Sequence, residues 1–276
     1  MAGFKTRVLS AVVLVVVLGT ALFFGGYYLW ALMLGASLTG YFEFVRAMRD
    51  PADRADMKPD ILELLGYAGV VAVYIVLLIV GPAHDLTLIY YTLIILLIAL
   101  MIIYVLRFPK YPTSKMMQIF FGVIYVGVML SFVYLTRIAV QGSKLIWLIF
   151  IASWICDTCA YLTGMALGRH KLAPELSPKK SVEGAIGGVV GAALVGFLYG
   201  LVINLGASAW MPAAVCGAGA VISQFGDLTA SAIKRNHDIK DYGNLIPGHG
   251  GILDRFDSVI ITAPIVFILS QIIIRG

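Results

Sequence analysis

Apolar runs of about 20 residues recur along the whole chain, and they limit its fold more than any other feature. A helix of that length crosses the roughly 30 Å hydrocarbon core of a bilayer. The alternation expected of barrel strands is absent. With 61% apolar and 13% charged residues, the chain has no polar stretch long enough to form a separate soluble core. The sequence therefore predicts an all-α, polytopic integral membrane protein.

The length rule predicts about nine membrane spans. They cover residues 8–25, 27–46, 61–81, 86–105, 117–136, 145–167, 183–204, 210–233 and 256–274. The first run follows Lys5 and Arg7 and resembles a signal peptide, but it is long and no small-x-small cleavage site follows it. We therefore expect a retained first helix.

Lysine and arginine gather in alternate turns between these spans, which predicts the orientation of the chain. The turns "GPAHDL" and "NLGASAW" carry none, and the turn after the fifth span has only Arg137 and Lys144. The N-terminus and every polar loop of interest are thus expected on the cytoplasmic side of a cytoplasmic membrane. The net charge of +5 without a basic tail argues against nucleic-acid binding and fits an anionic leaflet or anionic substrates. Residues 48–59 and 107–115 read as plain solvated linkers.

Acidic residues inside or beside the last two spans suggest a cation site. Asp227 precedes Lys234 by seven residues, which places it about 10 Å deeper in the membrane. A carboxylate there normally has a partner or a metal, and an ion pair or a protonated carboxyl stays open. Asp254 and Asp257 share a helix face where the last span starts, and helix capping explains only one of them. Because one loop joins the two spans, we expect Asp227 near Asp254, with Asp257 assisting, around Mg²⁺.

Cations and glycines crowd the loop between these spans. The cations there and on the preceding polar loop are Lys179, Lys180, Lys234, Arg235, Lys240 and Arg255. Glycines 248, 250 and 251 let backbone N–H groups approach an anion. His249 either donates to a phosphate or leaving group or bonds a backbone carbonyl. The combination predicts a polyphosphate ligand, although neither a P-loop nor a dinucleotide-binding fingerprint is present.

The preceding polar segment repeats this chemistry. Asp157 is another carboxylate in an apolar run. The run "SPKKS" offers the hydroxyls of Ser177 and Ser181, and two lysines lie between these serines. Ser181 and Glu183 either cap the following helix or contact substrate. Cys156 and Cys159 form a C-x-x-C pair without further metal ligands, so we interpret them as small packing residues. Pairs such as Gly184 with Gly188 indicate close helix packing and leave a homodimer open.

Residues 231–257 resemble the signature of the phosphatidate cytidylyltransferases, also called CDP-diacylglycerol synthases. The matching elements are Ser231-x-Ile233-Lys234-Arg235, Lys240-Asp241-x-Gly243 and Ile246-Pro247-x-His249-Gly250-Gly251-Ile252-x-Asp254-Arg255-Phe256-Asp257. The segment from Asp157 to Gly188 is also similar, with Ser181 where threonine is more usual. Residues 1–140 match only in being membrane helices.

The resemblance implies that CTP and phosphatidic acid react with Mg²⁺ to give CDP-diacylglycerol and pyrophosphate at the bilayer. It implies metal binding by Asp227, Asp254 and Asp257 and further catalytic roles for Lys234, Arg235 and His249. The implied substrate contacts are Ser177, Lys179, Lys180, Ser181, Glu183, Ser231, Lys240, Asp241, Gly250, Gly251 and Arg255. Residues 141–276 would carry the cytoplasmic catalytic cleft, and residues 1–140 would serve scaffolding, lipid access or dimer contact.

Two alternatives stay open. A lipid kinase using CTP or ATP on a polyprenol-type alcohol would need a similar metal site. An ion-coupled transporter would use Asp157 and Asp227 near the bilayer midplane, between broken helices.

Overall fold

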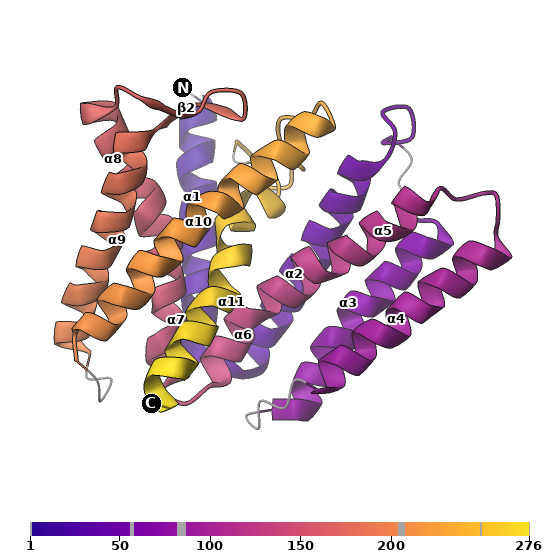
Figure 1. Cartoon of the computed structure of the whole chain (residues 1–276), viewed down its shortest axis with the longest axis horizontal. Coiled ribbons are helices and arrows are strands. Elements are labelled where there is room, and N and C mark those ends of the chain that lie inside the picture. Colours follow the sequence, from indigo (N-terminus) through magenta and orange to yellow (C-terminus); the bar gives the residue numbers. More distant parts are fainter. Residues whose placement is uncertain (1, 56–57, 82–86, 204–207, 249, 276) are drawn as a thin grey trace. The chain divides into compact units, whose positions relative to one another are not determined.

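The computed structural model describes residues 2–55, 58–81, 87–203, 208–248 and 250–275 (Figure 1). The chain forms two compact units. The first unit comprises Met1–Ile138 and Asp241–Arg255, and the second comprises Ala139–Lys240 and Phe256–Gly276. The expected division of roles between residues 1–140 and 141–276 stays a prediction, and the glycine-rich loop 241–255 packs with the first unit.

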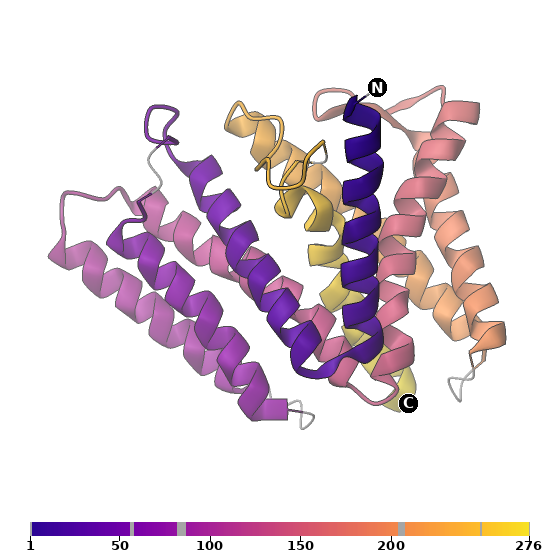
Figure 2. The same ribbon diagram turned by 180° about the vertical axis from the view of Figure 1, so that it is seen from behind.

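The first unit consists of helices. They are α1 (Ala2–Phe24), α2 (Gly26–Met48), α3 (Ile61–Val80), α4 (Thr87–Leu106), α5 (Thr113–Gly122), the π-helical η2 (Val123–Val128) and α6 (Met129–Ile138). The last three run on as one continuous helix, and α3 and α4 lie side by side (Figures 1 and 2). Gly25 has φ +66°, and the Arg137 guanidinium lies against it and donates to the carbonyls of Leu22 and Phe23, each at 3.0 Å. The end of α1 is thus satisfied by a side chain of α6.

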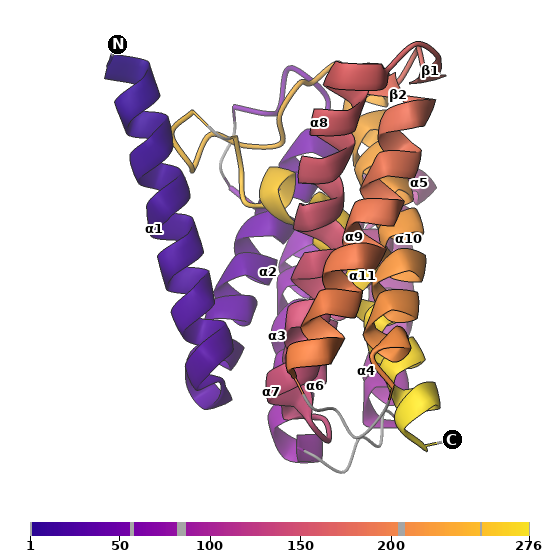
Figure 3. The ribbon, with the colours of Figure 1, turned by 90° about the vertical axis from the view of Figure 1, so that its left-hand side faces the viewer.

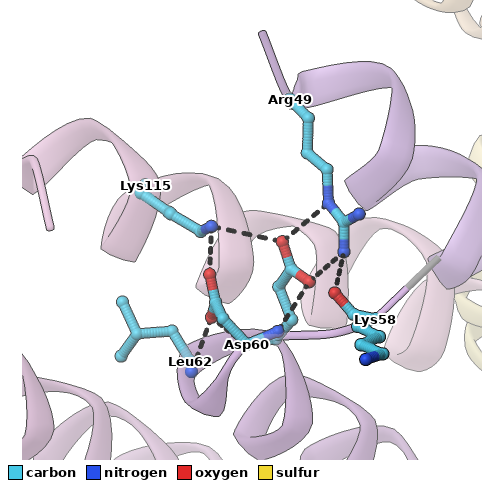
Figure 4. Close-up of polar contacts among 6 residues, drawn as sticks. Arg49, Lys58, Asp60, Leu62 and Lys115 are labelled. Carbon is cyan, nitrogen blue, oxygen red and sulfur yellow. Dashed lines mark hydrogen bonds and ion pairs between the residues drawn. The ribbon is translucent and has the colours of Figure 1, made fainter. Parts of the chain in front are cut away.

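An ion-pair network joins α2, α3 and α5 in the first unit (Figure 4). Asp60 and Glu63 form a capping box at the start of α3, with Glu63 N donating to Asp60 Oδ1 at 3.1 Å. Glu63, 1% exposed, is paired with both Arg49 and Lys115, and Lys115 also pairs with Asp60. We call these four residues the α2–α3 ion-pair network. It corrects the expectation that residues 48–59 and 107–115 are plain linkers, because Arg49 and Lys115 brace the start of a helix.

The second unit is built on α7 (Gly142–Phe150), the π-helical η3 (Ile151–Ile155), α8 (Cys156–Leu167), α9 (Val182–Val202), α10 (Trp210–Asn236) and α11 (Leu253–Arg275), whose first three residues are grouped with the first unit. Glycines set the approach of α9 to its neighbours. A Cβ at Gly188 would stand 2.9 Å from the Cys156 carbonyl, and one at Gly196 would stand 2.7 Å from the Pro212 carbonyl. The predicted close packing of small residues is therefore confirmed. Cys156 and Cys159 are free thiols that pack against glycines of α9.

A short antiparallel hairpin connects α8 to α9 (Figure 3). Its strands are β1 (Lys171–Ala173) and β2 (Ser177–Ser181), with Lys171 opposite Ser181 and Ala173 opposite Ser177. The sequence patterns do not predict this hairpin, because strands this short leave no measurable alternation. It holds "SPKKS" in an extended conformation at the end of the two helices.

Every predicted span overlaps a helical stretch in the described part of the chain, and α1 begins six residues before the first predicted span. Six of these stretches are long and apolar enough to cross a membrane, which confirms a multi-pass, all-α membrane protein. They are Ile61–Ile79, Thr87–Leu106, Thr113–Ile138, Gly142–Leu167, Val182–Val202 and Leu253–Ile272. The helices α2 and α10 are more polar, since α2 carries Glu43 and α10 carries Asp227 and Lys234.

Candidate functional site

Three carboxylates and two lysines gather in the second unit. Asp227 on α10 forms an ion pair with Lys180 of β2, and the two side chains are 29% and 26% exposed. Asp257 on α11 lies close enough to Asp227, Lys234 and Asp157 to interact with each electrostatically. The Ser258 hydroxyl donates to Asp157 Oδ2 at 3.4 Å. We call Asp157, Asp227 and Asp257 the acidic cluster.

The acidic cluster forms because α10 and α11 approach each other closely at Gly226. A Cβ there would stand 3.0 Å from the Asp257 carbonyl oxygen and 3.4 Å from the Ser258 Cα. Gly226 directly precedes Asp227, so the glycine that admits the α11 backbone also brings one carboxylate beside the other. In the dipeptide Gly-Asp of "QFGDL", the glycine thus permits close helix packing and the aspartate supplies a carboxylate at the same place.

The hairpin places Lys180 through contacts at the start of α9. Ser181 is the N-cap, and its hydroxyl accepts from Gly184 N at 3.1 Å, which confirms the predicted capping. The Glu183 carboxylate accepts from Arg169 N at 3.0 Å and lies 2.6 Å from His170 Nδ1. Both side chains therefore shape the turn and strand that carry Lys180. Their direct contact with substrate stays a prediction.

The remaining predicted residues of the second unit lie on β2 and at the end of α10. Ser231 and Lys234 are half-buried on the last turns of α10, whereas Arg235 is exposed. Lys240 is exposed after that helix, Lys179 is exposed on β2, and Ser177 at the start of β2 is half-buried. The cationic side chains thus come from two elements of the second unit, with Lys179 and Lys180 on β2 and Lys234 and Arg235 on α10.

In the first unit, Asp254 accepts hydrogen bonds from two backbone N–H groups of the glycine-rich loop. It is 7% exposed, and its Oδ2 accepts from Tyr242 N and from Gly251 N, each at 2.9 Å. Gly250 has φ +83°, a conformation that favours glycine, and a Cβ there would stand 2.8 Å from Asp254 Oδ2. Asp241 at the start of the loop is exposed and Arg255 after Asp254 is half-buried. His249 lies outside the described residues.

Glu43 on α2 binds the start of α11, a contact that the sequence patterns do not predict. It is 2% exposed and accepts from Ile252 N at 3.1 Å and from Leu253 N at 2.8 Å, at the first turn of α11. Nearby, Arg46 Nη2 donates to the Tyr242 carbonyl at 3.0 Å. The signal was available, because Glu43 is a carboxylate in an apolar run, as Asp227 is. The N–H groups of residues 251–253 thus serve carboxylates of the protein itself.

The donor set of the acidic cluster fits a hard divalent cation held partly by substrate. No three histidine, cysteine or acidic side chains among the described residues converge closely enough to hold a metal ion alone. Magnesium commonly takes only one or two carboxylates and completes its shell with water and substrate phosphates, which Asp227 and Asp257 would suit. Asp254 belongs to the first unit and Asp227 to the second, so their sharing of one ion stays a prediction.

Comparison with known proteins places the chain in a family. Relatives named phosphatidate cytidylyltransferase from Staphylococcus epidermidis, Staphylococcus aureus and Staphylococcus saprophyticus are 34%, 35% and 32% identical over 148 residues. Each alignment covers 54% of this chain and 56% of the relative, so the chain spans about half the length of the curated relatives it matches. A model described as the Cytidylyltransferase family matches residues 5–273. The chain therefore belongs to the cytidylyltransferase family.

Proposed function

We propose that the protein transfers the cytidylyl group of CTP to phosphatidic acid, giving CDP-diacylglycerol and pyrophosphate. The observation that carries this proposal is the acidic cluster beside Lys180 and Lys234 in a membrane protein of the cytidylyltransferase family. The names of the Staphylococcus relatives favour this reaction over the lipid-kinase and transporter alternatives. The proposal assigns no nucleic-acid partner and does not require a homodimer.

The chemistry asks the protein for alignment and charge neutralisation. A phosphate oxygen of the lipid attacks the α-phosphorus of CTP, and the bond from that phosphorus to the bridging oxygen of the leaving pyrophosphate breaks. Asp227 and Asp257 would hold Mg²⁺, which supplies positive charge to the phosphate oxygens. Lys180 and Lys234 stand beside these carboxylates and would contact the phosphates.

The remaining predicted residues complete the proposal. Arg235 and Lys240 follow on the same chain segment and would neutralise the triphosphate or the lipid phosphate. Asp254, His249 and Arg255 are assigned to the same reaction by the signature that they share with the family. Because no covalent intermediate is needed, no side-chain nucleophile is assigned.

The proposal includes a topology. Nine crossings would place the N-terminus and the polar loops at the cytoplasmic side of a cytoplasmic membrane, where CTP enters from water and phosphatidic acid from the bilayer. Single cysteines introduced by Asp53→Cys and Ser208→Cys would sit on opposite sides. A membrane-impermeant maleimide should label the first only in inverted vesicles and the second only in intact spheroplasts. Labelling of both from one side would contradict the topology.

The reaction is tested with purified protein, labelled CTP and phosphatidic acid, with and without Mg²⁺, by measuring pyrophosphate release and lipid-bound cytidine. Both products should form in equal amounts and only with Mg²⁺. Asp254→Asn should abolish the reaction, whereas Glu175→Gln, an exposed acid in the hairpin loop, should leave it unchanged. Pyrophosphate release without labelled lipid, or transfer to an alcohol lacking phosphate, would refute the proposal.

A further inference from the structure

The loop 241–255 is held from outside by one carboxylate, that of Glu43. Each of its two oxygens accepts one hydrogen bond, Oε1 from Ile252 N and Oε2 from Leu253 N. These N–H groups belong to the start of α11, where backbone donors have no partner within the helix. Glu43 thus occupies a position that would otherwise attract an external anion.

The glycines of the loop fall into two groups, and the difference points to Glu43. Gly248 and Gly250 have φ of +78° and +83°, so their backbone conformation favours glycine. Gly243 and Gly251 are not among the residues with positive φ in the described part of the chain. A Cβ at either position would nevertheless stand less than 3.0 Å from the Glu43 carboxylate. Two glycines of the family signature therefore leave room for the carboxylate of a side chain about 200 residues away, on α2.

The same loop is tied at its other end. Tyr242 donates its N–H to Asp254 and accepts from Arg46 at its carbonyl. Arg46 stands one turn after Glu43 on α2, so both side chains reach the loop from one helix face. Two charged side chains of α2 thus define the position of the segment that carries Asp254 and Arg255.

We propose that Glu43 is a positioning residue for the reaction: its carboxylate sets the conformation of residues 241–248 and 250–255 and thereby the placement of Asp254 and Arg255. This inference rests on the proposed function for its kinetic consequence. Its structural part, the hold of Glu43 on the Ile252 and Leu253 amides, is measurable without any activity.

The structural part is tested by hydrogen exchange on the full chain in detergent micelles. Amides of the peptide covering residues 241–255 should exchange at least about 10-fold faster in Glu43→Gln, because an amide side chain offers one acceptor where the carboxylate offers two. Glu63→Gln is the matched control, a second buried acid in the same unit. It should lower thermal stability and leave exchange of that peptide as in the wild type. Unchanged exchange in Glu43→Gln would overturn the proposal.

The kinetic part is tested by a double-mutant cycle. Gly251→Ala alone should lower kcat/KM for CTP about 10- to 100-fold, since a displacement of about 1 Å costs that much in an aligned site. In a Glu43→Ala background the same glycine change should cost less than about twofold, because the group that the new methyl meets is gone. Gly66→Ala, which meets Tyr41 instead, should cost the same in both backgrounds.

The outcomes separate the two claims. Equal costs of Gly251→Ala in both backgrounds would overturn the positioning role even with an active wild type. An inactive wild type with Glu43-dependent exchange would instead refute the proposed reaction and leave the hold of Glu43 on the loop established.

Discussion

Two charged clusters in this protein, one in each unit, differ in their charge balance. The α2–α3 ion-pair network has two acids and two bases, and Glu63 is paired with both bases. The acidic cluster of the second unit has three carboxylates beside Lys180 and Lys234. A balanced network stabilises a helix start, whereas an excess of acid at a half-buried place favours a cation. Charge balance, more than burial, distinguishes the structural cluster from the candidate site.

Among the changes that compare the two clusters, the largest effect is expected from removing one charge of the acidic cluster. Asp227→Asn should lower kcat/KM for CTP by about 100- to 1,000-fold, because a group that neutralises charge in the transition state is lost. The thermal midpoint should change little, since the partner Lys180 is partly exposed and stays solvated. Steady-state assays with labelled CTP and a thermal melt measure both. Near-wild-type turnover would place Asp227 with the structural residues.

In the α2–α3 ion-pair network we expect a loss of stability without a loss of activity. Glu63→Gln should destabilise the protein by roughly 3 kcal/mol, because it leaves Arg49 and Lys115 without their buried counter-charge. The activity per folded molecule should persist. Thermal unfolding followed by tryptophan fluorescence, together with assays at low temperature, would check this. A loss of activity without a loss of stability would erase the distinction between the two clusters.

A smaller loss of stability is expected at Ser181, which caps a helix beside the candidate site. Ser181→Ala removes the N-cap of α9 and should destabilise the protein by about 1 kcal/mol. Ser181→Thr, which keeps the hydroxyl, should restore stability. If Ser181→Ala instead raises KM for CTP while Ser181→Thr does not, the hydroxyl contacts substrate in addition to capping the helix.

The smallest effect is expected from the exposed edge of the ion-pair network. Lys115 is 26% exposed and pairs with Asp60 and Glu63. Lys115→Met should cost at most about 1 kcal/mol, and raising the salt concentration should reduce that cost further. Melts at two ionic strengths measure it. A cost that is large and insensitive to salt would show that the network is as buried at Lys115 as it is at Glu63.

Much of the fold follows from local pattern. Apart from the start of α1, six residues before the predicted span, the apolar runs predict the ends of each helical stretch to within four residues. Length and apolar character decide whether a segment can satisfy its backbone in lipid. The predicted cap at Ser181 is confirmed because an N-cap is likewise local, a hydrogen bond between residues three apart in the chain. The β1–β2 hairpin escapes such reasoning, since its short strands depend on the ends of α8 and α9 and on Glu183.

By itself, the sequence determines that this is a multi-pass helical membrane protein of the cytidylyltransferase family. It also shows that several carboxylates lie in apolar segments, where a buried charge is unfavourable. Only the tertiary structure decides which of them meet. Gly226 lets α11 approach α10 and brings Asp257 beside Asp227, and α2 carries Glu43 to a loop about 200 residues away. Helix formation is a local property of the chain. The pairing of charges depends on how closely two backbones approach, which packing around small residues decides.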